Sequence, residues 1–315
     1  MKNEPVQTPE FGDEISFESP ILAPNVKAVN EFTAFGTTDD FGVWAKVTDD
    51  AWDEDDWSAL PTHMNHVQIT NQAGTWKAAT GSYFWLKQDY LNFVAYAPYT
   101  GVAAKASLSE DSGIAITGYD VSTTAANQKD LLVSDRVADK QNGPVAIAFD
   151  HVLSSINFVV TNTTKGSTFT VKDISIYNVA NTGNYSQGLT AETHEADHTW
   201  DDQSGKVTYN AFSGTIELAY TTESAPSVKV AAEENTTALI LLPQDFGAES
   251  TAKIVVTYSQ PNSADATATY NLKNSSWAPG TRYTYTISFG AEEITFTPSA
   301  NTWTDADPQP NPSQE

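Results

Sequence analysis

A period-two alternation of apolar and polar residues is the feature that most limits how this chain can fold. In residues 282–289, RYTYTISF, the large side chains at 283, 285, 287 and 289 share one face, and hydroxyl side chains fill most of the other. Such alternation is typical of an antiparallel strand with one face in water. The same pattern recurs at residues 145–149, 155–160, 168–171, 174–179, 215–220, 253–258 and 293–297. Two more continuously apolar runs, 91–98 and 238–244, predict strands that are covered on both faces.

Turn-forming clusters of Gly, Asn, Asp and Pro separate these segments, as in TNTTKGST and SQPNSAD. Many short strands at this spacing predict an all-β protein built of β-sandwiches. The best helix signal, residues 123–135, predicts only a turn or two of helix. Without a fixed short repeat, solenoid and propeller folds are set aside.

The length of 315 residues suits two domains, each with its own core. A polar Gly-Pro stretch at 138–146 predicts the boundary, so we expect one sandwich at 1–143 and a second at 144–304. The Pro-rich, polar segment 305–315 is expected to be disordered.

Composition excludes several functions. A net charge of −24 repels phosphate backbones and anionic lipid, so no nucleic-acid partner is expected. The absence of cysteine rules out disulfides, thiolate metal sites and a cysteine nucleophile. No run approaches the roughly 18 apolar residues that span a bilayer, and the first residues lack the apolar core of a signal peptide. Either the chain is cytosolic, or it begins after a signal that has been removed.

The acidic stretch 49–56, next to Trp52 and Trp57, raises three alternatives. A calcium loop of the EF-hand type needs alternating acids, a central glycine and a distal glutamate, and this stretch lacks that order. Adjacent acids also rarely hold the opposed geometry of a glycosidase pair. The preferred interpretation is a solvated loop with the two tryptophans as anchors, and glycan recognition on these rings stays an alternative.

Other candidate chemistry is weak. His194 and His198 have the H-E-x-x-H spacing of zinc proteases, but the segment lacks an apolar stripe and ends in turn residues, so we expect a loop and not the helix that this motif needs. Ser154 and Ser155 follow His151, but the spacing specifies no hydrolase triad. Nucleotide-binding glycine motifs and a nucleophile elbow are missing from the sequence. We therefore expect no catalytic residue, no cofactor and no metal site, and predict a protein that is not an enzyme.

Several segments, taken in order, resemble the fimbrillin (Mfa-like) family of Bacteroidota, the subunits of type V pili. The most specific are LNFVAYAP (91–98), FDHVLSSINF (149–158) and WAPGTRYTYTISF (277–289). Weaker matches are ISF (15–17), FGVWAKV (41–47), KDLLVSD (129–135), LILLPQ (239–244), IVVTY (254–258) and ITFTPSANTW (294–303). Together they cover most of the chain in the family's order.

The resemblance implies two transthyretin-like β-sandwich domains in tandem and export to the cell surface as an outer-membrane lipoprotein precursor. It also implies cell adhesion through a pilus (fimbrium), with other pilus subunits as partners and a host protein or glycan as a further one. Family members polymerise after a protease removes an N-terminal strand, when another subunit's donor strand fills the emptied groove. The lipid-anchor cysteine is missing, which agrees with a sequence that starts after it.

Carried onto this sequence, the removable strand spans about residues 13–27 and includes Ile15 and Phe17. The processing point would fall between Lys27 and Ala28, where Lys27 replaces the family's usual arginine. Ile294, Phe296 and Trp303 match the terminal strand and are candidate strand-exchange positions, unless they simply complete the second sandwich. The alternative function is a surface glycan-binding protein that does not polymerise.

Overall fold

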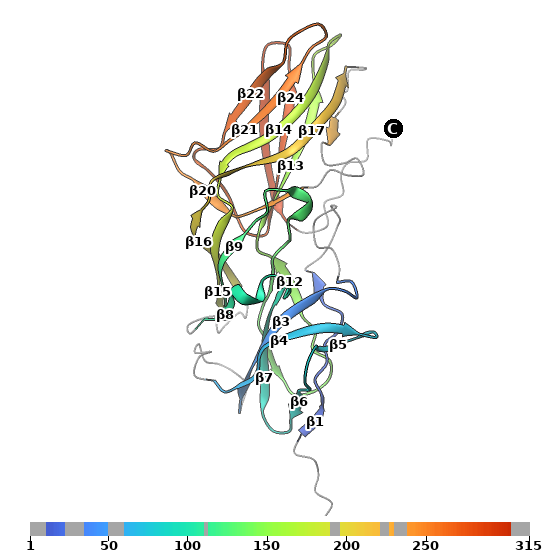
Figure 1. The fold of residues 1–315 in the computed structure, drawn as a ribbon, viewed down its shortest axis with the longest axis vertical. Coiled ribbons are helices and arrows are strands. Elements are labelled where there is room, and N and C mark those ends of the chain that lie inside the picture. The colour runs from blue at the N-terminus through green and yellow to red at the C-terminus, as the bar shows by residue number, and fades with distance from the viewer. Residues whose placement is uncertain are drawn as a thin grey trace, which may run out of the picture.

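The computed structural model describes residues 11–22, 35–49, 60–109, 113–189, 196–220, 227–229 and 238–303. These residues form twenty-five strands and two short 3₁₀ helices, η1 (Ala103–Lys105) and η2 (Ala125–Asn127), and no α-helix. The predicted all-β class is confirmed. The strands follow one another along an elongated molecule, with the chain's N-terminal half at one end (Figure 1).

An eight-stranded sheet forms the end that carries the N-terminal half of the chain (Figure 1). Its order is β2 (Ile21–Leu22), β12 (Ala148–His151), β10 (Leu132–Ser134), β7 (Tyr90–Ala97), β3 (Asp40–Thr48), β4 (Thr62–Gln72) and β5 (Thr75–Ala78), with β11 (Val137–Lys140) also paired to β7. Beside it, β1 (Phe11–Glu14) pairs with β6 (Phe84–Leu86). All these pairs are antiparallel except β12 with β2.

Two sheets pack face to face at the other end of the molecule (Figure 1). One contains β18 (Ser227–Lys229), β13 (Ser154–Asn162), β24 (Thr281–Phe289) and β25 (Ile294–Thr302) in that order, with β19 (Leu239–Leu241) also on β13. The other contains β17 (Val207–Ala219), β14 (Thr168–Val179), β21 (Lys253–Ser259) and β22 (Ala266–Asn271). Phe289 of the first sheet lies 5.0 Å from Phe169 and 5.3 Å from Tyr258 of the second, ring centroid to ring centroid.

A four-stranded sheet lies between these two ends and pairs segments that are far apart in the sequence. Its order is β16 (Ala196–Ser204), β15 (Thr182–Leu189), β9 (Ile114–Asp120) and β8 (Ala106–Leu108), and β20 (Gln244–Phe246) with β23 (Ser275–Trp277) forms a separate pair. The pairing of β9 with β15 joins a segment that precedes residue 143 to one that follows it.

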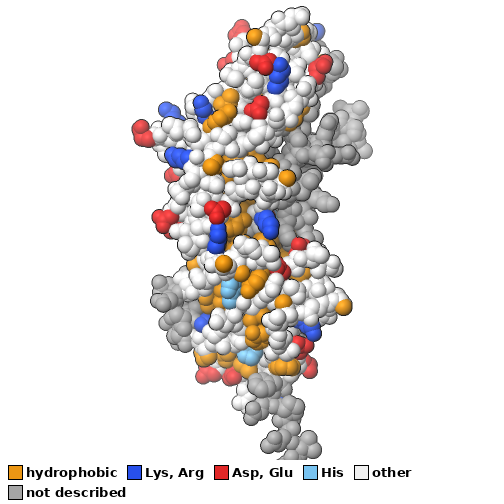
Figure 2. Space-filling model, in the orientation of Figure 1, with side chains coloured by type: hydrophobic (Ala, Val, Ile, Leu, Met, Phe, Trp, Pro, Cys, Tyr) orange, Lys and Arg blue, Asp and Glu red, His pale blue; other side chains and the backbone are white. Residues whose placement is uncertain are grey.

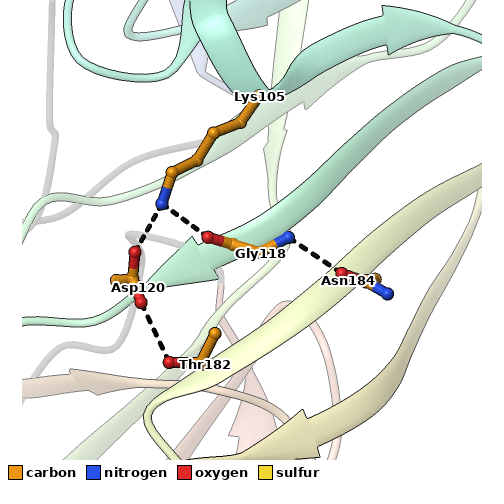
Figure 3. A network of polar contacts seen from close by, with 5 residues as sticks. All are labelled: Lys105, Gly118, Asp120, Thr182 and Asn184. Atoms are coloured by element: carbon orange, nitrogen blue, oxygen red, sulfur yellow. Dashed lines mark hydrogen bonds and ion pairs between the residues drawn. The ribbon is translucent and has the colours of Figure 1, made fainter.

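A polar network holds β9 against β15 (Figure 3). The Lys105 ammonium donates to the Gly118 carbonyl and to the Asp120 carboxylate, both at 2.5 Å. Thr182 donates to the other Asp120 oxygen at 2.9 Å, and the Gly118 N–H donates to the Asn184 side chain at 2.8 Å. The hydrogen bond from Lys105 is the main cause that lowers the pKa of Asp120, against a smaller opposing effect of burial. The network fixes the pairing where the ladder register shifts.

The buried apolar residues form two clusters. The first core runs from Ile15 to Phe149, and the second combines Trp44, Val94 and other residues of the N-terminal half with most of the buried residues after 150. Alternate residues of β7 serve the two cores, since Phe93 lies in the first and Val94 in the second. The apolar run 91–98 is therefore covered on both faces, as predicted. The division into domains at 143 and 144 stays a prediction.

Figure 2 shows one face of the molecule, on which Lys and Arg side chains lie scattered among acids and hydrophobic side chains are visible in several groups. Large exposed hydrophobic residues are few in the described part of the chain: Ile21 is 60% exposed and Phe84 40%. Ile21 lies on β2, which pairs with β12, and Phe84 lies on β6, which pairs with β1.

Candidate functional site

The N-terminal segment 15–22 lies between two parts of the chain and hydrogen-bonds to both. On one edge, the Ile15 N–H donates to the Tyr83 carbonyl at 2.7 Å, and the Phe17 N–H to the Trp76 carbonyl at 2.8 Å. The segment thus runs antiparallel to the chain at Trp76. These bonds satisfy backbone groups that burial would otherwise leave unpaired.

The opposite edge pairs with residues 145–149, in a parallel sense. The Val145 N–H donates to the Ser16 carbonyl, and the Glu18 N–H to the Val145 carbonyl, both at 2.9 Å. Further along, the Ile21 N–H donates to the Ile147 carbonyl at 3.1 Å. The segment therefore fills a place between two strands, with partners on both sides.

Apolar side chains of this segment enter the first core. Ile15, Phe17 and Leu22 are only 3–4% exposed. The Phe17 ring makes edge contacts with Phe41 at 5.4 Å and Phe93 at 5.9 Å between centroids. Burying three such side chains contributes roughly 5–9 kcal/mol before conformational entropy is subtracted. The structure brings the predicted residues Ile15 and Phe17 together in one core.

Other predicted positions lie outside the described residues. These are the processing point Lys27 and Ala28, the tail 305–315, and most of the acidic stretch 49–56 with Trp52 and Trp57. Their predicted roles stay predictions.

The C-terminal candidates lie on and just after β25. This strand pairs with β24 over nine residues, from Ile294 opposite Phe289 to Thr302 opposite Thr281. Among the described residues β25 has no second partner, so it forms the edge of its sheet. Ile294 and Phe296 are partly buried against the second core, and the Phe296 ring stacks on Tyr270 at 5.6 Å. These residues are thus in a different core from Ile15 and Phe17.

Trp303 follows β25 and is buried, with 4% of its surface exposed. Its backbone N–H donates to the Gly280 carbonyl at 2.6 Å. The indole stacks flat on the imidazole of His151, with centroids 4.1 Å apart and planes 5° from parallel. His151 Nδ1 in turn lies 2.6 Å from a carboxylate oxygen of Asp130, and both side chains are buried. The stack anchors the end of β25.

The N-terminal segment and Trp303 both contact β12. Phe149 of this strand pairs with Leu22. Two residues further along the strand, the His151 imidazole stacks on the Trp303 indole. Sequence reasoning did not identify Trp76 and Val145 as partners of the N-terminal segment, nor the contact of Asp130 with His151. Asp130 and His151 do belong to two segments of the family resemblance, KDLLVSD and FDHVLSSINF, and that is the one sequence signal that points to them.

The buried pair of Asp130 and His151 does not form a hydrolase triad. The Ser154 hydroxyl donates instead to the Ala278 carbonyl at 2.8 Å, and Trp303 covers one face of the imidazole. Within the described residues, no group of three or more His, Asp or Glu side chains is arranged to hold a metal ion. The same part of the chain contains no helix that is long and apolar enough to span a membrane. What the arrangement offers is packing and strand pairing.

A family model and several solved structures match this chain. The family model described as fimbrillin-like matches residues 27–303. None of the curated proteins matches the chain.

Solved structures share the fold over nearly the whole chain. A protein described as a cell adhesion protein from Bacteroides uniformis is 16% identical, with a TM-score of 0.53, covering 92% of this chain and 99% of its own. A fimbrial protein from Bacteroides vulgatus is 20% identical, with a TM-score of 0.53 and coverages of 90% and 99%. A cell adhesion protein from Bacteroides ovatus is 19% identical, with a TM-score of 0.51 and coverages of 93% and 98%. Since the family model covers most of its length, the chain belongs to the fimbrillin-like family.

Proposed function

We propose that this chain is a cell-surface pilus subunit or related adhesin, and that it assembles by donor-strand exchange after proteolytic removal of its N-terminal strand. Family membership supports the coarser statement, a pilus subunit or adhesin. The pairing of the N-terminal segment supports the finer mechanism.

The observation that carries the proposal is the double pairing of residues 15–22. The segment hydrogen-bonds to Trp76 and Tyr83 on one edge and to Val145 and Ile147 on the other. Its removal would expose two strand edges. It would also expose the surfaces of Phe41 and Phe93 that the Phe17 ring covers in the first core. Unpaired edges and exposed apolar surface favour pairing with a new strand. Main-chain bonds would then supply affinity, and the sites of Ile15 and Phe17 would fix the register.

The C-terminal strand β25 is the second element that we assign to strand exchange. β25 lies at a sheet edge among the described residues, and most of its residues are exposed. In the proposal, Ile294, Phe296 and Trp303 take part in strand exchange, either as donor side chains or as the lining of the accepting site. The partners are other pilus subunits, and the protein acts without catalysis at the outer surface, exported as a lipoprotein precursor.

A processing assay tests the mechanism. The purified chain is treated with a lysine-specific protease under native conditions and analysed on a denaturing gel without boiling. We expect cleavage after Lys27 to convert monomers into a ladder of oligomers, because the resident segment is no longer covalently held and another chain can replace it. Boiling should return the ladder to monomers.

The Lys27→Ala variant is the matched control, since it keeps every described residue and removes only the processing point. It should stay monomeric under the same digestion. Persistent monomers from the wild-type chain, with cleavage after Lys27 verified by mass, would contradict donor-strand exchange. Equal ladders from the wild-type and Lys27→Ala chains would contradict the proposed processing point.

A further inference from the structure

A groove lies between β16 and the pair of β20 and β23. It is open to solvent, with a volume of about 540 Å³. Residues 198–203 form one wall, and residues 243–245 and 276–279 form the other. The Gln203 side chain donates to the Pro243 carbonyl and joins the two walls. The groove therefore belongs to two separate sheets.

One wall of the groove is a strand with a single partner. β16 pairs with β15 over residues 196–204, and it has no strand on its other side in the described part of the chain. The unpaired N–H and C=O groups of such an edge are a template for an extended peptide. A segment added there would continue the sheet formed by β16, β15, β9 and β8.

An immobilised indole lies on this strand. Trp200 is partly buried, and its ring N–H donates to the Val152 carbonyl at 2.7 Å. Its ring contacts Tyr185 at 5.5 Å and Tyr119 at 5.9 Å between centroids, and it also lines the groove. A fixed indole binds without much loss of side-chain entropy, and Trp is the best aromatic partner for a cation.

Charge in the groove is of one sign. Asp201, Asp202 and Asp245 line it and are exposed, and no Lys or Arg is among its lining residues. Asn184 donates to one oxygen of Asp202 at 3.1 Å, which leaves the other oxygen available. Burial lowers the pKa of His198, so this residue is neutral near pH 7 and does not offset the acids.

The negative charge of the groove also favours one kind of bound segment over another. A second copy of this chain carries a net charge of −24 and is repelled from three carboxylates. Acidic residues on an exposed edge strand suppress pairing with most other strands. A strand that carries Lys or Arg side chains is instead attracted to these carboxylates.

We propose that the groove between β16 and the β20–β23 pair binds an extended, basic peptide segment of another protein, added alongside β16. Main-chain hydrogen bonds to β16 hold the segment. Its Lys or Arg side chains contact Asp201, Asp202 and Asp245, and one of them lies over the ring of Trp200. This binding is independent of strand exchange at the N-terminal segment.

Isothermal titration calorimetry with synthetic peptides tests the proposal. The probe is a nine-residue peptide, the length of β16, in which Thr and Val alternate with Lys and Arg. We expect it to bind, with affinity that falls as salt is raised. A peptide with Glu in place of every Lys and Arg should not bind. The same basic peptide N-methylated at alternate residues should bind at least tenfold more weakly, because it cannot complete the ladder.

Variants locate the site. Asp201→Asn, Asp202→Asn and Asp245→Asn combined should weaken binding about tenfold, the sum expected of three exposed ion pairs. The combination of Glu217→Gln, Glu292→Gln and Glu293→Gln removes the same charge from exposed positions on β17 and the β24–β25 turn, and should change affinity less than threefold. Equal effects of the two triple variants would overturn the site. Spermine that binds as tightly as the basic peptide, or an N-methylated peptide that binds unchanged, would overturn strand addition.

Discussion

Replacing Phe17 by Ala perturbs the N-terminal segment more directly than any other single change. Phe17 is 4% exposed, and its ring touches Phe41 and Phe93. A buried Phe→Ala substitution costs about 3–5 kcal/mol, through lost burial and the cavity left behind. If residues 15–22 can detach while the rest of the molecule stays folded, the substitution weakens the binding of this segment to the first core by the same roughly 3–5 kcal/mol. Opening of the segment should then increase roughly 100-fold or more.

Hydrogen exchange measured by mass spectrometry detects the opening of this segment. In the Phe17→Ala protein, the peptide covering residues 12–22 should exchange roughly 100-fold or more faster than in wild type. The ladder between β24 and β25, in the other half of the molecule, should keep its protection. Faster laddering after cleavage at Lys27 should accompany the change, since the resident strand is held more weakly.

Phe158→Ala is the matched control, because Phe158 is 3% exposed but lies in the second core. It should lower the free energy of unfolding by a similar amount without selective opening of residues 12–22. The reasoning is refuted if the two variants give the same exchange pattern. In that case the N-terminal segment would unfold only with the whole molecule.

Three further predictions follow from other contacts. Burial, and then the charge of Asp135, raise the pKa of Asp150 to about 6, so the folded protein holds this proton more tightly than the unfolded chain. The contribution of Asp150 to stability should therefore fall as pH rises from about 4 to 6. Asp150→Asn should be more stable than wild type by about 1 kcal/mol near pH 7, after allowance for solvent screening, and this difference should shrink at pH 4, as measured by urea unfolding midpoints at pH 4 and pH 7. Trp303→Ala should lower the free energy of unfolding by about 3–5 kcal/mol, and Trp303→Phe, which keeps a ring over His151, by less; equal losses would show that the stack contributes nothing. Lys172→Met should change stability by less than about 1 kcal/mol in a thermal melt, because the ion pair with Asp265 is exposed.

Local pattern predicted many of the strands well. The alternation at 282–289 appears in β24, where Tyr285, Ile287 and Phe289 are buried and the residues between them are less so. The continuous run at 91–98 became β7, which lies between two cores. In both cases, the period of the pattern reports how many faces of a strand are covered.

The predicted helical turn within 123–135 was confirmed only at its start. The structure has a 3₁₀ helix at Ala125–Asn127, followed by the strand Leu132–Ser134. Leu131, Leu132 and Val133 are all buried, because alternate residues of this segment serve the two cores. A short apolar run does not distinguish a strand buried on both faces from a helix.

Long-range pairing was beyond what the sequence pattern could predict. Nothing local to ISF, residues 15–17, indicates that it pairs with Trp76 on one side and Val145 on the other. The groove at Trp200 was missed for the same reason, since its walls come from segments that are separated in the sequence. The family resemblance supplied roles for Ile15 and Phe17, and the structure supplied their neighbours.

Native mass spectrometry of the chain cut after Lys27 tests the central claim most directly. The account predicts that fragment 1–27 first stays bound without a covalent link, held by the bonds and side chains of residues 15–22. With time, oligomers should appear that have lost this fragment. Each donor strand that is accepted should displace one fragment. A cleaved chain that keeps its fragment and stays monomeric at high concentration would contradict the account, as would oligomers that retain every fragment.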